Sequence, residues 1–216
     1  MLKKLTRQAI LVAAATVTAG AQAGSYDDFF TAITRDNPTE ISALLKRGFD
    51  VNSRSTKGQV ALFEAVQKDS EKAVTALLQS ESLDINALND KGESVLMMAA
   101  LKGKLELCEL LLKRGANVNK DGWTPLHYAA TGPEPRAVAL LLARGADLEA
   151  ESPSKNTALM MAVRYGPETS VDLLLAQGAD LKRVNAAGWN AAELAANVGR
   201  EGLSKRLQQA PSGNRR

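Results

Sequence analysis

One stretch decides the fold of this 216-residue chain: Gly122-Trp123-Thr124-Pro125-Leu126-His127-Tyr128-Ala129-Ala130. Thr124 is a good N-cap residue, because its side-chain oxygen can accept a free backbone N–H at a helix start. Pro125 follows at the first helical position, where its missing N–H costs nothing. The stretch therefore predicts a helix that begins at Pro125 and carries a small pair, Ala129-Ala130, against which a neighbouring helix can pack closely.

This stretch recurs along the chain at a nearly constant spacing. Its opening position is occupied by Gly58, Gly92, Gly122, Lys155 and Gly188, so the steps are 34, 30, 33 and 33 residues. In the copies that open at Gly92 and Gly122, a leucine triplet and then a Gly-Ala pair follow the small pair. A period near 33 residues with a Thr-Pro-Leu-His core resembles the ankyrin repeat.

The resemblance implies an all-α ankyrin-repeat solenoid, in which helix-turn-helix units stack and short hairpin fingers connect them. We expect the ankyrin domain at 24–210, with an N-terminal capping repeat at 25–52, four internal repeats at 53–185 and a C-terminal cap at 186–209. Residues 211–216 are expected to form a disordered tail. The short step of 30 residues predicts a stunted finger before Gly122, and Lys155 at a glycine position predicts altered geometry in the next finger.

The N-terminus has the pattern of a secretory signal peptide at 1–23. Lys3, Lys4 and Arg7 precede an uncharged apolar run at 9–19, and small residues at Ala21, Ala23 and Gly24 fit a cleavage site. The run is shorter than the ~20 residues that span a bilayer. We therefore expect cleavage after Ala23, a periplasmic or secreted protein, and no membrane anchoring afterwards.

Charge and cysteine content narrow the possible partners. The chain has 27 Lys and Arg and 24 Asp and Glu, and the segment 1–23 carries three basic residues and no acidic one. The processed chain would thus have 24 of each, without the cationic surplus that nucleic-acid binding needs. Cys108 is the single cysteine, so no intramolecular disulfide can form.

No constellation in the sequence predicts catalysis. His127 is the single histidine and lies in the repeat core, so we interpret it as a structural residue that ties neighbouring repeats together, as the resemblance implies. One histidine also excludes a multi-histidine metal site. Cys108 falls at a core-facing phase, and Met97-Met98 and Met160-Met161 share one repeat position, which indicates packing. We expect no enzyme, no metal and no cofactor.

The resemblance implies a concave face, formed by the fingers and first helices, that holds another protein. The repeat frame separates positions that maintain the stack from those free to vary, and Thr131 belongs to the variable set. Large aromatics and arginine are favoured interface anchors. We predict partner binding by Trp123, Tyr165, Trp189, Arg164, Lys91, Glu93, Leu101, Lys102, Gln59 and Tyr128.

The leading hypothesis is a non-catalytic binding or scaffold protein of the bacterial periplasm, monomeric, with a protein as partner. An alternative keeps the architecture but makes it an immunity or stress-protection protein that neutralises a toxin or supports an exported enzyme. A host-directed effector is a further alternative. An enzyme with an unrecognised site is the least favoured hypothesis, because paired titratable groups at reacting spacing are missing.

Overall fold

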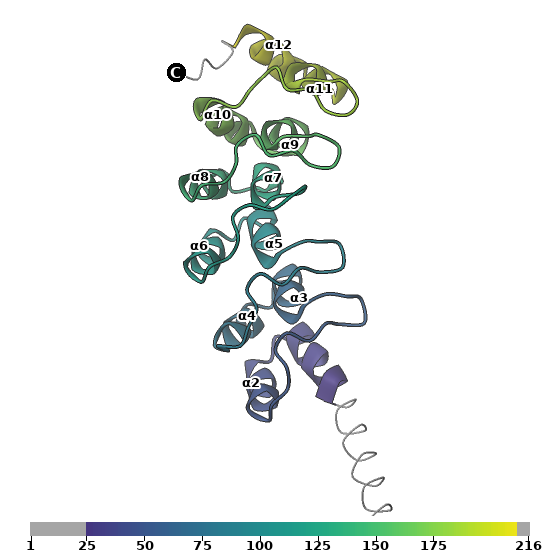
Figure 1. Ribbon diagram of the computed structural model, residues 1–216, viewed down its shortest axis with the longest axis vertical. Helices are drawn as coiled ribbons and strands as arrows, with labels where there is room; N and C mark the ends of the chain where they lie inside the picture. The colour runs from purple at the N-terminus through teal and green to yellow at the C-terminus, as the bar shows by residue number, and fades with distance from the viewer. Residues whose placement is uncertain (1–24, 211–216) are drawn as a thin grey trace, which may run out of the picture. The chain divides into compact units, whose positions relative to one another are not determined.

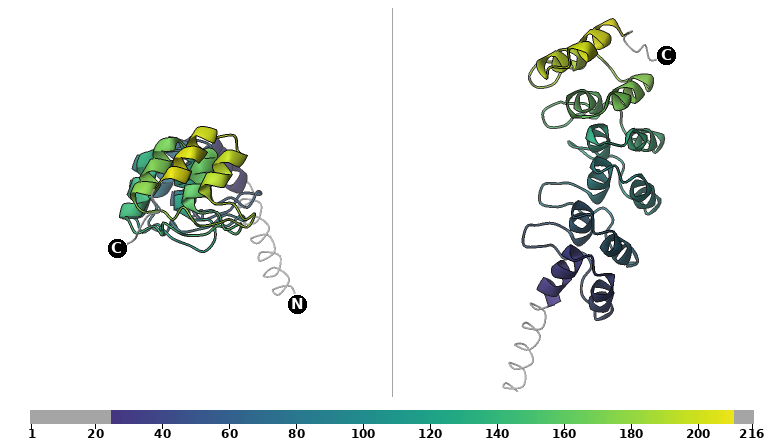
Figure 2. Two further views of the ribbon diagram at one scale, coloured as in Figure 1. Left: turned by 90° about the horizontal axis from the view of Figure 1, so that it is seen from above. Right: turned by 180° about the vertical axis from the view of Figure 1, so that it is seen from behind.

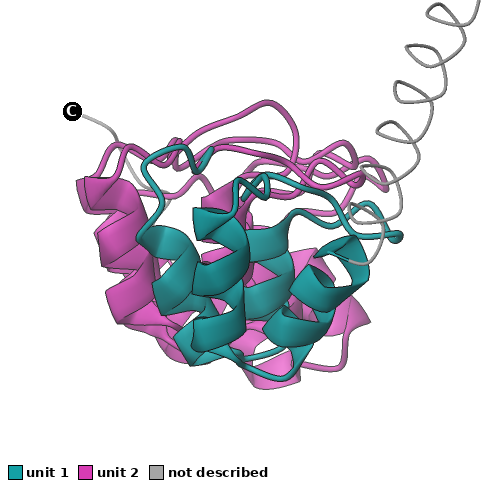
Figure 3. Cartoon of the chain, turned by 90° about the horizontal axis from the view of Figure 1, so that it is seen from below, with its two compact units in different colours: residues 1–84 teal, residues 85–216 magenta. Residues whose placement is uncertain are grey.

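The computed structural model describes residues 25–210. The predicted signal peptide with Ala21, Ala23 and Gly24, and the predicted tail at 211–216, lie outside the described residues. The chain divides into two compact units, residues 1–84 and 85–216, which are described separately (Figure 3). Within the described residues no helix is long and apolar enough to cross a bilayer.

Both units are built from pairs of short helices (Figure 1). In unit 1, a helical segment at 25–34 is followed by α2 (Pro38–Lys46), α3 (Ala61–Gln67) and α4 (Glu71–Leu78). The helices of unit 2 are α5 (Val95–Leu101), α6 (Leu105–Lys113), α7 (Pro125–Thr131), α8 (Pro135–Ala143), α9 (Ala158–Tyr165), α10 (Glu168–Ala176), α11 (Ala191–Asn197) and α12 (Glu201–Gln209). The described residues contain isolated β-bridges but no extended strand, so the predicted all-α fold is confirmed.

In unit 2 the helices form two rows (Figures 1 and 2). The first helices of the repeats, α5, α7, α9 and α11, pack successively on one another, and the second helices α6, α8 and α10 do the same. Loops between the pairs project to one side as fingers. This arrangement places equivalent positions of successive first helices side by side.

Three of the five first helices, α5, α9 and α11, start with the predicted side-chain cap, whereas at α7 the Thr124 hydroxyl bonds to His127 Nδ1 (2.9 Å) instead of a backbone N–H. The side chains of Ser94, Thr157 and Asn190 each accept the backbone N–H of the residue three positions on, which satisfies a donor left free at the helix start. Val60, in unit 1, makes no such bond. Because valine has no side-chain oxygen, α3 starts without a side-chain cap.

The core lies between the two helix rows. The middle residue of each leucine triplet in unit 2, namely Leu111, Leu141 and Leu174, is fully buried, as are the small residues Ala99 and Ala129 on the first helices. The outer leucines of the triplets are half-buried or exposed. In unit 1, Phe29, Ile33, Ile41 and Leu44 are buried in the core, whereas Phe30 and Leu45 are only half-buried. Phe30 lies at the edge of the core, where its ring packs edge-to-face against that of Phe29.

Side-chain hydrogen bonds join one finger to the next. In unit 2, Asn86 Nδ2 donates to the Gly115 carbonyl (3.0 Å) and Asn86 Oδ1 accepts the Asn117 N–H (2.7 Å). Asn119 makes the same pair of bonds one repeat later, and Asn52 makes it within unit 1. The amide suits this role because it donates and accepts at once.

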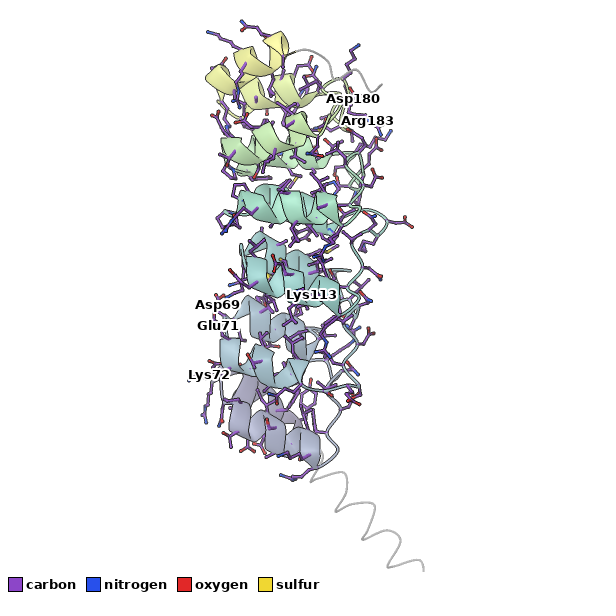
Figure 4. The ribbon with its side chains drawn as sticks, turned by 90° about the vertical axis from the view of Figure 1, so that its left-hand side faces the viewer. Asp69, Glu71, Lys72, Lys113, Asp180 and Arg183 are labelled. Carbon is purple, nitrogen blue, oxygen red and sulfur yellow. The ribbon has the colours of Figure 1, made fainter. Side chains whose placement is uncertain are left out.

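The last joint of this ladder uses a carboxylate instead. Glu149 Oε1 accepts the Asp180 N–H at 2.8 Å, and Glu149 also forms an ion pair with Arg183 (3.6 Å), which in turn reaches Glu151 at 3.2 Å. Asp180 and Arg183 both lie on the finger side of unit 2 (Figure 4). A charged pair therefore stabilises the finger where the amide ladder stops.

The finger before α9 keeps its geometry despite the lysine. Lys155 has φ +56°, close to the +75° and +81° of Gly122 and Gly188 at the equivalent position. The prediction of altered geometry in this finger is therefore wrong. Lys155 adopts the left-handed backbone conformation, which is strained for a residue other than glycine. In the short finger, Lys120 Nζ donates to the carbonyls of Asp121 and Trp123.

Arg200 fastens the C-terminal pair α11 and α12 to the repeat before it. Its guanidinium Nη1 lies 3.3, 2.9 and 3.1 Å from the carbonyl oxygens of Ala162, Val163 and Gly166, and Nη2 lies 3.5 Å from Glu168. The carbonyls at the end of α9 are thus satisfied by a cation, which also suits the helix dipole.

Candidate protein-binding face

A small pocket opens on unit 2 along the first helices α5, α7 and α9. Its volume is about 180 Å³ and its wall is almost entirely carbon. The residues that line it are Leu101, Trp123, His127, Tyr128, Thr131 and Met161. Leu101 and Thr131 hold the same repeat position on α5 and α7, so the pocket follows from the stacking of neighbouring repeats.

Trp123 forms one wall of the pocket and is held in place by two rings. Its indole packs edge-to-face against His127, with ring centroids 5.4 Å apart, and against Tyr128 at 6.2 Å. Such aromatic pairs stabilise by roughly 0.5–1.5 kcal/mol beyond the area they bury. The indole is half-buried, and the two contacts hold it as a preorganised wall of the pocket.

Tyr128 reaches back to the finger of the preceding repeat. Its hydroxyl donates to Glu93 Oε1 at 2.8 Å, while Glu93 Oε2 accepts Asn89 Nδ2, also at 2.8 Å. Burial, and then the hydrogen bond to the carboxylate, raise the pKa of Tyr128. The phenol therefore stays protonated as a donor, and both oxygens of Glu93 are engaged.

His127 lies at the back of the pocket and bridges two repeats. The Thr124 N–H donates to Nδ1 (3.2 Å), so the ring proton lies on Nε2, which donates to the Asn156 carbonyl at 2.8 Å. Burial lowers the pKa of His127, which keeps the ring neutral. Because both nitrogens are engaged, the imidazole is a structural connector and not a poised base. The structural role predicted for it is confirmed.

Next to the pocket, one repeat further on, α9 ends in an exposed aromatic and cationic pair. Tyr165 is 58% exposed, and the guanidinium carbon of Arg164 lies 5.2 Å from its ring centroid. Arg164 holds on α9 the position that Thr131 holds on α7. A guanidinium stacked on a ring is held in a defined orientation, which suits it to bind a planar anion.

The structure brings some of the predicted partner-binding residues together and leaves others apart. Leu101, Trp123 and Tyr128 line the pocket, Glu93 joins them through the tyrosine hydroxyl, and Arg164 lies with Tyr165 at the equivalent end of α9. Lys102 directly follows Leu101 at the end of α5. Lys91 lies in a finger, Trp189 follows the last finger glycine and is 36% exposed, and Gln59 belongs to unit 1. None of these last three lines the pocket.

Three pocket residues, Thr131, Met161 and His127, were not among the predicted partner-binding residues. Met161 was interpreted as a packing residue, yet it is half-exposed in the pocket, unlike its buried neighbour Met160. It shares its repeat position with Tyr128, and that shared position was the signal available in the sequence. His127 contributes a ring edge to the lining in addition to its structural bonds.

The described residues contain no group of three or more His, Cys, Asp or Glu side chains that could hold a metal ion. Cys108 is fully buried, and burial raises the pKa of its thiol to about 12. A thiolate nucleophile needs a lowered pKa and solvent access, and Cys108 has neither.

A second, more polar pocket belongs to unit 1 and has a volume of about 340 Å³. Its lining includes the carboxylates of Asp27 and Glu64 and the cations Arg35 and Lys57, so its charges balance.

Comparison with known protein families agrees with this architecture. The family described as "Ankyrin repeats (3 copies)" matches residues 81–152 and 134–212, and the chain belongs to the ankyrin-repeat family. The Notch-regulated ankyrin repeat-containing protein of Xenopus tropicalis is 36% identical over 87 residues, which are 38% of this chain and 76% of that protein.

Two further relatives are much longer proteins from Caenorhabditis elegans. Protein glp-1 is 28% identical over 168 residues, 70% of this chain but 13% of its own length. The E3 ubiquitin-protein ligase hecd-1 is 28% identical over 120 residues, 55% of this chain but 4% of its own length. The likeness therefore concerns a short part of each of these two proteins. Ankyrin repeats generally serve protein–protein interaction, through the extended surface that stacked repeats create.

Proposed function

We propose that this chain is a non-catalytic protein of the bacterial periplasm that holds a protein partner on unit 2. The binding face consists of Leu101, Trp123, Tyr128, Arg164 and Tyr165. The observation that carries the proposal is the exposed Arg164–Tyr165 pair beside a preorganised apolar pocket. Aromatic and arginine side chains next to a pocket are the features that concentrate binding energy in protein interfaces.

A binding role agrees with the chemistry of the described residues. The single histidine is neutral and engaged at both nitrogens, and the single cysteine is buried with a raised pKa. Both side chains are almost fully buried, whereas general-base or nucleophilic catalysis needs a group that can contact a substrate. The ankyrin family supports the same role, because its members generally bind other proteins.

Export is supported by the pattern at 1–24, which has a basic start, an apolar run and small residues at the expected cleavage site. Fractionation of cells that express the chain, followed by N-terminal sequencing, tests this part of the proposal. We expect a periplasmic product that starts at Gly24. An uncleaved product confined to the cytoplasm would contradict it.

The binding face is tested by affinity capture from a periplasmic extract. Wild type is compared with the Trp123→Ala, Tyr165→Ala double variant, with equal helix content checked by circular dichroism. Leu110→Ala is the matched control, because Leu110 is 42% exposed on the second helix α6. We expect the double variant to lose partners that wild type and the control retain. Equal recovery by all three would exclude this face, and the identity of the partner would distinguish scaffolding from toxin neutralisation or stress protection.

A further inference from the structure

The size of the pocket indicates what kind of group it holds. Small-molecule and cofactor sites usually occupy about 300–1,000 Å³, and this pocket of about 180 Å³ is smaller. Its carbon wall offers little for a polar ligand to bind. A single apolar side chain inserted from a partner fits both properties, as in the pockets that receive anchor residues in protein interfaces.

The charges beside the pocket are of one sign where the first helices end. The segments 101–104, 131–132 and 164–166, at the C-terminal ends of α5, α7 and α9, contain Lys102, Lys104 and Arg164 but no acidic residue. In the turn that follows α7, Glu134 is already paired with Arg136 at 2.7 Å. Lys102 and Lys104 have interaction partners within the chain, and Arg164, whose guanidinium stacks on Tyr165, is the cation at this edge with a defined orientation.

The carboxylate of Glu93, which is hydrogen-bonded to a pocket side chain, is already fully engaged. Its two oxygens accept from Tyr128 and Asn89. The ammonium of Lys120 lies 3.4 Å from the Trp123 carbonyl. The pocket thus combines an apolar floor with an oriented arginine beside it.

We propose that the pocket receives an apolar side chain from a partner segment whose neighbouring residues are acidic. The apolar anchor, of leucine to phenylalanine size, contacts Trp123, and a flanking carboxylate binds Arg164. Arg164 is suited to this because Tyr165 orients its guanidinium, and arginine can bind a carboxylate with two parallel hydrogen bonds. This inference rests on the proposed function of the binding face.

Repeat geometry sets the spacing of the acidic residues. Packed helices lie about 8–10 Å apart, and an extended chain advances about 3.3 Å per residue. Arg164 lies one repeat beyond Thr131 in the pocket wall, so a carboxylate about three positions from the anchor can reach it. The recognised segment is therefore an extended peptide with Asp or Glu about three residues from a Leu, Met, Phe or Trp.

A display selection with random 12-residue peptides on the purified chain tests the proposal. The enriched peptides should share this spacing, and their affinity should be measured by fluorescence anisotropy at two salt concentrations. We expect Trp123→Ala to weaken binding about tenfold or more. The charge reversal Arg164→Glu should weaken it comparably and reduce the salt dependence. Lys113→Glu, at the end of the second helix α6 (Figure 4), is the control and should leave binding unchanged.

Enriched peptides without acidic residues, or peptides that bind the charge-reversed variant as well as wild type, would overturn the inference, and so would the failure to enrich any peptide. Failure of the two proposals can be told apart. If periplasmic partners are lost in the Trp123→Ala, Tyr165→Ala variant while no acidic consensus emerges, the face stands and this inference falls. If peptides bind as expected but partner capture is unchanged, the proposed function of the face fails.

Discussion

Replacing Gly166 with alanine measures how closely successive repeats pack in unit 2. A Cβ atom at this position would lie 2.0 Å from the Ala130 carbonyl oxygen and 3.0 Å from Ala162 Cα, and contacts below 3.0 Å essentially do not occur. The backbone of Gly166 (φ −88°, ψ 172°) is one that alanine adopts freely, so no torsional strain contributes. The effect is therefore purely steric, and α7 and the turn after α9 must separate by more than about 1 Å.

The expected loss follows from two opposing effects. Overpacking costs about 1–3 kcal/mol, and the upper end applies because the obstacle is backbone and cannot rotate away. Restricting the unfolded chain returns about 0.4–1 kcal/mol. The net destabilisation is about 2 kcal/mol, which lowers a urea midpoint by about 1 M for a slope near 2 kcal/mol/M. Fluorescence is the appropriate signal, because both tryptophans, Trp123 and Trp189, lie in unit 2.

Two glycines of the same unit serve as comparisons. At Gly132 the added Cβ would lie 2.6 Å from the Ala100 carbonyl oxygen, a smaller overlap, so Gly132→Ala should cost less than Gly166→Ala. Gly202, in α12, has no neighbour within 4 Å, and alanine there should stabilise by about 0.5–1 kcal/mol. If Gly166→Ala unfolded at the wild-type midpoint, neighbouring repeats would be able to move apart at little cost, and the reasoning would be refuted.

Four further outcomes are expected. Burial lowers the pKa of His127 below its ordinary 6.5, so below pH 6.5 the unfolded chain binds a proton that the folded chain does not. The free energy of unfolding should therefore fall by up to about 1.4 kcal/mol per pH unit as the pH drops from 6.5 toward 5. Urea unfolding across that range should show this slope, and His127→Met should flatten it. Lys155→Gly should raise stability by about 0.5–1 kcal/mol, since it removes left-handed strain, and an unchanged melting temperature would contradict this. Arg200→Ala should lower the stability by about 2 kcal/mol because backbone carbonyls lose a charged donor. Arg206→Ala removes only exposed ion pairs and should lower the stability by under about 1 kcal/mol. Equal losses of stability in urea titrations would show that the carbonyl bonds of Arg200 contribute nothing. Cys108 should react with a thiol reagent at the rate of unfolding, and rapid labelling of the folded chain would disprove its burial.

The fold could be predicted because its determinants are local and repeated. The helix starts at Ser94, Thr124 and Thr157 follow from side chains within a few residues, and the spacing of the copies gives the stacking partners. Where prediction failed, a single residue departed from the repeat pattern without changing the structure. Lys155 is the example, because stacking on neighbouring fingers holds its backbone in a conformation that the residue type disfavours.

The candidate site was only partly predictable, because it depends on side-chain rotamers that link different repeats. The sequence identified Trp123 and Tyr128 as candidates for partner binding, but the Tyr128 hydroxyl bonds to Glu93, 35 residues earlier, which the sequence does not indicate. Met161, from the following repeat, lines the same pocket. The role of Arg200 could not be predicted for the same reason, since its acceptors are backbone carbonyls that no sequence motif identifies.

The bonds of Arg200 also bear on how this protein can change in length. Its acceptors surround a Gly-Pro-Glu turn at 166–168, and the same three residues recur at 132–134. A chain that lost the 33 residues from 155 to 187 would bring the terminal helix pair onto α7 and α8, where Gly132 and Glu134 offer an equivalent seat. We therefore expect the terminal pair to pack on α7 and α8 in such a shortened chain, once Arg200 replaces Arg136 at Glu134.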